Sequence, residues 1–187
     1  MSIQTLDKLL ICHIDCSIWS GRKKLRPEDF RLANGSQLPP KDVASLGSKK
    51  ICDPEALANF ERLKKEAQRL CEQVGVRFLG GYAVPEDRID QIVPELDRIG
   101  QEFAQCKQLF LDNYDQVTFD WVAKHPEFAD AIRRALSPIE DVEQRLQFDY
   151  AIYRMQPAEQ AGGLDDKVNG MGHTLFREVA RDANELF

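Results

Sequence analysis

An apolar seam between residues 85 and 124 constrains the fold of this chain more than any other feature of its sequence. Its apolar side chains recur at alternating gaps of three and four residues, at Ile89, Ile92, Leu96, Ile99, Phe103, Cys106, Phe110 and Val117, with Asn113 at the one polar position. This spacing is typical of a long helix with an apolar stripe along one side. Pro94 and Gly100 weaken the helix locally, but the stripe keeps its phase through both. We therefore expect one kinked helix over about 85–124.

Two shorter segments have the composition of β-strands. From Cys12 onward, residues 9–19 alternate apolar and polar side chains, which indicates a half-buried strand. Residues 76–84 are also rich in strand-forming residues, with a break at Gly80-Gly81. Because two strands alone are marginally stable, we expect a small β element that packs on helices.

Further helices are predicted on both sides of the seam. Asp53-Pro54-Glu55 is a helix start, and helical spacing follows it as far as Val74. A short helix is expected after His125-Pro126, another over 139–153, and a last one over 157–187. These elements favour a mainly α fold, an elongated helical bundle or coiled-coil hairpin around the 85–124 helix, with a small β element at 9–19 and 76–84.

The same pattern suggests three parts. Residues 1–84 form an N-terminal α+β portion with a basic loop at 20–50, residues 85–155 form the long helix and a helical hairpin, and residues 157–187 form a C-terminal helix. The sequence ends on an apolar stripe without a capping signal. We therefore expect the natural chain to continue beyond Phe187.

Charge is unevenly distributed along the chain. Residues 1–81 carry 14 Lys and Arg against 10 Asp and Glu, whereas residues 82–187 carry 11 against 21. The candidate binding residues belong to the basic segment and its flank: Trp19, Arg22, Lys23, Lys24, Arg26, Lys49 and Lys50. Such residues can contact phosphates, with an aromatic side chain to stack on bases, or grip an acidic protein. They can equally be a solvated loop that balances the acidic helices.

No catalytic or cofactor site is predicted. Cys12, His13, Asp15 and Cys16 are suitable zinc ligands, but on a strand the two cysteines lie about 13 Å apart, too far to share one ion. The phosphate-loop and dinucleotide-binding motifs are absent. Residues 1–10 show no signal-peptide pattern, so the expected compartment is the cytoplasm, where five cysteines without framework spacing are expected to be reduced thiols. The sequence contains no run of eighteen apolar residues, so no membrane span is predicted.

Three stretches carry a family resemblance: Trp-Ser-Gly-Arg-Lys-Lys-Leu at 19–25, Leu-Gly-Ser-Lys-Lys-Ile-Cys-Asp-Pro-Glu-Ala-Leu at 46–57, and Gly-Val-Arg-Phe-Leu-Gly-Gly-Tyr-Ala-Val-Pro at 75–85. Over most of its length the chain resembles the family called domain of unknown function 3150. The resemblance implies a protein of bacterial mobile elements and phages, whose gene often lies near that of a MoxR-type AAA-plus ATPase. It implies no catalytic residue.

Taken together, these observations predict a non-enzymatic adaptor or accessory factor that binds protein, either an AAA-plus ATPase or a host factor. The alternative is an accessory protein that binds nucleic acid through the basic segment 22–50. A metal-dependent enzyme using Cys12, His13 and Cys16 is a third and weaker hypothesis. Self-association through the long helix is left open.

Overall fold

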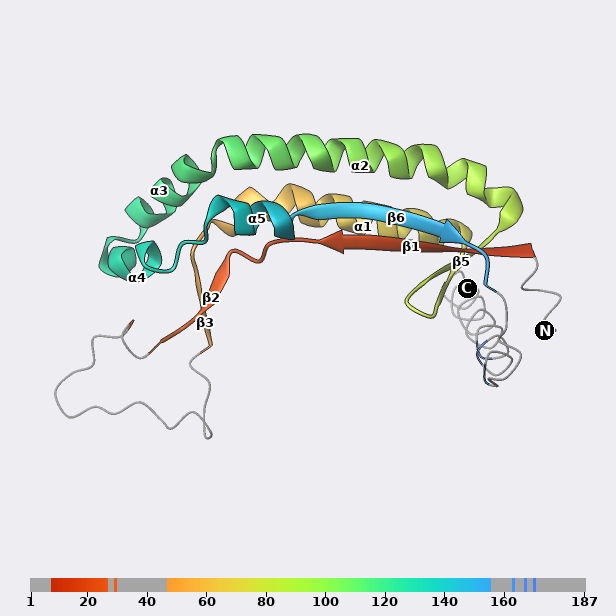
Figure 1. The fold of residues 1–187 in the computed structure, drawn as a ribbon, viewed down its shortest axis with the longest axis horizontal. Helices are drawn as coiled ribbons and strands as arrows, with labels where there is room; N and C mark the ends of the chain where they lie inside the picture. The colour runs from red at the N-terminus through yellow and green to blue at the C-terminus, as the bar shows by residue number, and fades with distance from the viewer. Residues whose placement is uncertain are drawn as a thin grey trace, which may run out of the picture. The chain divides into compact units, whose positions relative to one another are not determined.

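A computed structural model describes residues 8–26, 29, 47–155, 163, 167 and 170 (Figure 1). The chain divides into two units built from interleaved segments. The first, here called the sheet unit, comprises residues 1–16, 63–103 and 148–187, and the second, the ribbon unit, comprises 17–62 and 104–147.

The fold is mixed α/β, so the prediction of a mainly α coiled-coil bundle is wrong. Of the described residues, 59% are helical and 23% lie in strands, and the strands include a four-stranded antiparallel sheet. The prediction placed strands at 9–19 and 76–84 but missed those at 22–24, 48–50 and 147–153. A sheet of this size is a principal layer of its unit rather than a small addition to helices.

The sheet has the strand order β4-β5-β1-β6. Its strands are β1 (Leu9–Ser17), β4 (Val76–Phe78), β5 (Gly81–Pro85) and β6 (Gln147–Tyr153). In β1, Cys12 lies opposite Tyr82 of β5. His13 and Asp15 are exposed while Cys12 is buried, as the alternation in the sequence predicted.

Two helices, α1 (Ala58–Val74) and α2 (Ile89–Asp112), pack on this sheet. From α1, the thiol of Cys71 lies 3.6 Å from that of Cys12. From α2, the ring of Phe103 lies 5.7 Å from that of Phe148, and Asp97 accepts a 2.6 Å hydrogen bond from the Tyr150 hydroxyl. Phe103 belongs to the apolar stripe expected from the sequence, whereas the contacts of Cys71 and Asp97 with the sheet were not predicted.

Residues 139–153 were predicted to form one helix, and this is wrong after residue 145. Helix α5 (Ile139–Arg145) ends there and β6 begins two residues later. Along β6 the half-buried side chains are Phe148, Tyr150 and Ile152, a spacing of two. Aromatic and β-branched residues at this spacing favour a strand, and pairing with β1 supplies its hydrogen bonds.

In the ribbon unit, two short strands pair and helices pack around an aromatic core. Its elements are β2 (Arg22–Lys24), β3 (Ser48–Lys50), the 3₁₀ turns Pro54–Leu57 and Pro126–Phe128, α3 (Tyr114–Lys124), α4 (Ala129–Arg133) and α5. In the core, Trp19 lies 6.2 Å from Phe110 and 5.8 Å from Tyr114 between ring centroids. Phe60 packs edge-on against Phe110.

The predicted helix over 85–124 is interrupted, but not at Pro94 or Gly100. Both lie inside α2, and the break falls at Asn113. The Asn113 side-chain amide donates a 2.8 Å hydrogen bond to the Leu109 carbonyl, and its own carbonyl accepts from the Val117 N–H. Asn side chains compete in this way for backbone groups at helix ends, so the polar position in the seam closes α2, and α3 begins after it with an ordinary backbone hydrogen bond.

Some predicted elements lie outside the described residues. These are the C-terminal helix over 157–187, apart from residues 163, 167 and 170, and most of the loop 27–46 with its expected helical turn. Among the helices that the structure does describe, none is both long enough and apolar enough to span a bilayer.

Candidate functional site

Pairing of β2 with β3 brings the two basic runs of the sequence together. Arg22 lies opposite Lys50, Lys23 opposite Lys49, and Lys24 opposite Ser48. The pairing extends beyond the strands, because the Ile51 N–H bonds to the Gly21 carbonyl at 2.8 Å. We call β2 and β3 together the basic ribbon. The sequence placed these residues in one segment but did not predict that they would pair.

The basic ribbon presents its cations on two faces. Arg22, Lys24 and Lys50 are exposed, whereas Lys23 and Lys49 are half-buried on the other side. Like charges directly opposite each other on a sheet are destabilising. Arg22 faces Lys50 and Lys23 faces Lys49, so the ribbon carries two such pairs. An anion bound to the exposed face would relieve the repulsion between Arg22 and Lys50.

On the inner face, Lys49 is neutralised by Asp29. Its Nζ lies 2.5 Å from Asp29 Oδ1, and the two side chains are only 13% and 4% exposed. Burial by itself raises the pKa of Asp29. The hydrogen bond and charge of Lys49, with a hydrogen bond from the Arg26 N–H, outweigh burial and hold that pKa below its usual value. The pair therefore stays charged at neutral pH, with no net charge.

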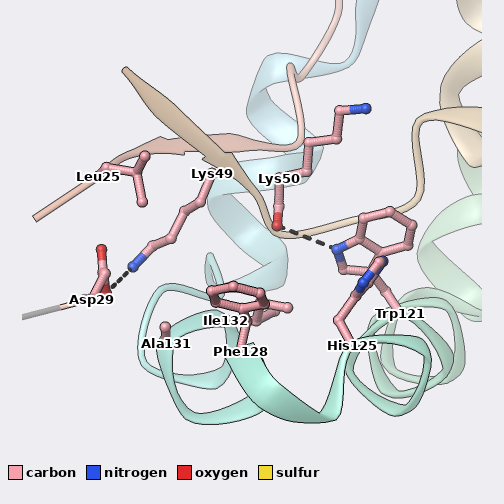
Figure 2. Close-up of a pocket in the computed structure, with 9 residues that line it drawn as sticks. All are labelled: Leu25, Asp29, Lys49, Lys50, Trp121, His125, Phe128, Ala131 and Ile132. Carbon is pink, nitrogen blue, oxygen red and sulfur yellow. Dashed lines mark hydrogen bonds and ion pairs between the residues drawn. The ribbon is translucent and has the colours of Figure 1, made fainter. Parts of the chain in front are cut away.

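A pocket of about 240 Å³ lies beneath the ribbon (Figure 2). Most of its wall is apolar. Its lining residues are Leu25, Asp29, Lys49, Lys50, Trp121, His125, Phe128, Ala131 and Ile132. Figure 2 shows Lys49 reaching down toward Asp29 while the ammonium group of Lys50 points away from the pocket. The pocket therefore joins the inner face of the ribbon to α3 and α4.

Hydrogen bonds hold the helices of the pocket to the ribbon. The Trp121 indole N–H donates to the Lys50 carbonyl at 3.2 Å, and the Trp121 and His125 rings lie 4.3 Å apart. Lys124 at the end of α3 pairs with Asp53 at 2.9 Å. The Lys124 hydrogen bond and the Glu55 N–H lower the pKa of Asp53 against a smaller opposing effect of burial. The ribbon and the pocket wall are therefore fixed to each other.

Of the predicted binding residues, Trp19 lies away from this surface. Only 2% of it is exposed, and its ring contacts Phe110 and Tyr114 in the core. It supports the start of β2 from inside and offers no ring to a ligand. Arg26 is exposed just beyond the ribbon. The other five predicted residues, together with Ser48, make up the ribbon.

The pocket residues on α3 and α4 were not predicted as a site. Trp121 lies on α3, His125 directly follows it, Phe128 lies on the 3₁₀ turn and Ile132 lies on α4. The surface that they form is partly open, and Phe128 is 55% exposed. Because the sequence places a helix boundary at His125-Pro126, spacing along one helix could not bring these residues together.

The hypothetical metal ligands lie apart in the sheet unit. Cys12 is buried against Cys71, whereas His13 projects from the opposite face of β1. Among the residues that the structure describes, no three His, Cys, Asp or Glu side chains are grouped so that they could hold a metal ion. The hydrogen bond from Cys71 lowers the pKa of Cys12 despite burial, and the same bond with burial raises that of Cys71.

Comparison with known proteins identifies the family. The family model described as "Protein of unknown function (DUF3150)" matches residues 6–187. Searches of curated proteins and of solved structures gave no match. Because the family model covers nearly the whole chain, this protein belongs to the DUF3150 family.

Proposed function

We propose that this protein is a non-enzymatic adaptor that binds an acidic segment of a partner protein on the exposed face of the basic ribbon. The observation that carries the proposal is the cross-strand register. Arg22 and Lys50 lie opposite each other, Lys24 shares their face, and within the described residues none of the three has a carboxylate partner in an ion pair. Such a face repels itself and attracts carboxylates.

The family resemblance supplies two candidates for this partner, which we carry into the proposal. A AAA-plus ATPase is the first candidate, and a host factor bound by a mobile element or phage is the second. We place this encounter in the cytoplasm, where the five cysteines would remain thiols.

Nucleic acid is the second candidate ligand. It is favoured by the same three cations, because phosphate contacts require only positive side chains. Base stacking, however, needs an accessible aromatic ring beside the cations, and Trp19 is buried. The exposed face of the ribbon therefore supports backbone contacts better than recognition of bases.

Charge reversal on the ribbon tests the proposal. We would co-express the protein with a AAA-plus ATPase encoded by a neighbouring gene. Complexes are recovered by affinity purification, and their contacts are mapped by cross-linking. Arg22→Glu with Lys24→Glu is expected to abolish the complex. The matched control is Lys65→Glu with Arg69→Glu on α1, which changes net charge equally at two exposed cations. Equal loss in both variants would show that overall charge, not the ribbon, is responsible.

A parallel titration separates protein from nucleic acid. Labelled DNA and RNA oligonucleotides are titrated with the protein at several salt concentrations. If nucleic acid is the ligand, the logarithm of the binding constant falls linearly with the logarithm of salt concentration, with a slope of about −0.9 per phosphate neutralised on duplex DNA. Under the adaptor proposal, we expect no binding of DNA or RNA that depends on Arg22 and Lys24.

A further inference from the structure

We infer that the pocket beneath the basic ribbon receives one large apolar side chain from the same acidic partner segment. This inference rests on the proposed function and deepens it. The exposed face of the ribbon would hold carboxylates, while the pocket on the inner face would hold an apolar anchor. The partner motif is therefore a phenylalanine, tryptophan or leucine flanked by aspartates and glutamates.

The size of the pocket favours a side chain over a cofactor. Its volume is about 240 Å³, below the range of about 300–1,000 Å³ that is usual for small-molecule sites. A space of this size admits a side chain but not a dinucleotide. Protein interfaces concentrate their binding energy at such buried anchors, which are commonly aromatic.

The chemistry of the wall favours an apolar group. Leu25, Trp121, Phe128 and Ile132 supply apolar surface, and Phe128 remains 55% exposed in the absence of a partner. The Lys49 ammonium is paired with Asp29 at 2.5 Å, and the ammonium of Lys50, the other lysine of the lining, points away from the pocket (Figure 2), so neither lysine offers its charge to a buried carboxylate. Burying a charge there would be unfavourable, whereas burying a hydrocarbon group would remove water from Phe128.

The link between ribbon and pocket allows both contacts at once. Trp121 in the pocket wall donates its indole N–H to the carbonyl of Lys50, and the Lys50 ammonium group lies on the exposed side of the ribbon (Figure 2). A rigid arrangement of this kind lowers the entropic cost of binding a second group once the first is bound. Anchor and acidic flanks should therefore contribute to binding together.

The test uses fluorescein-labelled peptides with one central Phe between runs of Glu, and the same peptides with Ala at the centre. Binding to the full chain is followed by fluorescence anisotropy. We expect the Phe peptide to bind at least about ten-fold tighter than the Ala peptide. Phe128→Ala should reduce this ratio to below about three-fold. Phe119→Ala is the matched control, because Phe119 is 65% exposed in the same unit but does not line the pocket.

Each result decides between the inference and the proposed function. If both peptides bind equally and Arg22→Glu with Lys24→Glu abolishes binding, the ribbon stands and the anchor pocket is refuted. If the Phe peptide keeps its advantage and the ribbon variant binds normally, the ribbon is refuted and the pocket stands. No binding of either peptide would refute both. If sedimentation shows a dimer that Phe128→Ala dissociates, the pocket is filled by a second copy and the inference is overturned.

Discussion

Replacing Trp19 distinguishes a core residue from a ligand-binding one. In the structure, Trp19 is 2% exposed and contacts the rings of Phe110 and Tyr114. Truncating a buried aromatic residue to alanine costs about 3–5 kcal/mol, a range that already contains the aromatic contacts. Natural domains are stable by about 5–15 kcal/mol. Trp19→Ala should therefore remove a large part of the free energy of unfolding.

The assay is urea unfolding followed by far-ultraviolet circular dichroism, with stability extrapolated to water. Because Trp19→Ala can leave too little folded protein to measure, Trp19→Phe is made in parallel and should cost about 1–3 kcal/mol. Phe119→Ala serves as the control, since Phe119 is 65% exposed in the same unit. Its effect should stay within about 0.5 kcal/mol.

Two results would refute this reasoning. A cost below about 1 kcal/mol for Trp19→Ala would place the indole at the surface, as for an ordinary exposed residue. Loss of partner binding by Trp19→Phe without loss of stability would make it a direct contact residue. The expected outcome is the reverse: Trp19→Phe lowers stability and leaves peptide affinity unchanged at temperatures where the protein is folded.

Three further changes test the fold. Asp53→Ala should cost about 0.5–2 kcal/mol through loss of the helix cap, whereas Asp53→Asn keeps the cap acceptor and removes only the charge. The pKa of Asp53 is lowered in the folded state, so its charge stabilises the native protein above about pH 4, and this contribution is lost as the pH falls below that value. The difference in free energy of unfolding between the native protein and Asp53→Asn, measured by urea titration, should therefore disappear at low pH. Gly75→Ala should cost about 1–3 kcal/mol in thermal unfolding, because its new methyl group would lie 2.6 Å from the Ala83 carbonyl oxygen, while Gly100→Ala inside α2 meets only ordinary contacts and should be neutral or stabilising. Burial raises the pKa of Tyr114 to about 12, so stability should fall as pH rises from about 10 to about 12, and Tyr114→Phe should flatten that decline.

Several local features were predictable because they depend on neighbours in the sequence. Asp53 caps the turn that leads into α1, as Asp-Pro-Glu indicated, since a side-chain acceptor and a proline both suit a helix start. The alternation in β1 identified its buried side, because successive residues of a strand face opposite ways. The cationic residues of the candidate site were also evident, since charge can be read from residue type alone.

Residues 147–153 show where local information ends. Leu146, Tyr150 and Tyr153 have helical spacing, while Phe148, Tyr150 and Ile152 have strand spacing. The two patterns overlap in the same short segment and share Tyr150, so periodicity cannot choose between them. The hydrogen bonds offered by β1, more than a hundred residues away, favour the strand. The pairing of β2 with β3 in the basic ribbon could not be predicted for the same reason, because a long connection separates the two strands in the sequence.

The sequence alone therefore determined which segments prefer helix or strand, which of their faces are apolar, and where positive charge is concentrated. Only the tertiary structure decided that Arg22 pairs with Lys50, that Trp19 is inside, and that Phe128 lines an open pocket. The physical reason is that helical turns and strand alternation involve residues a few positions apart. Strand pairing and burial depend on contacts between residues far apart in the chain.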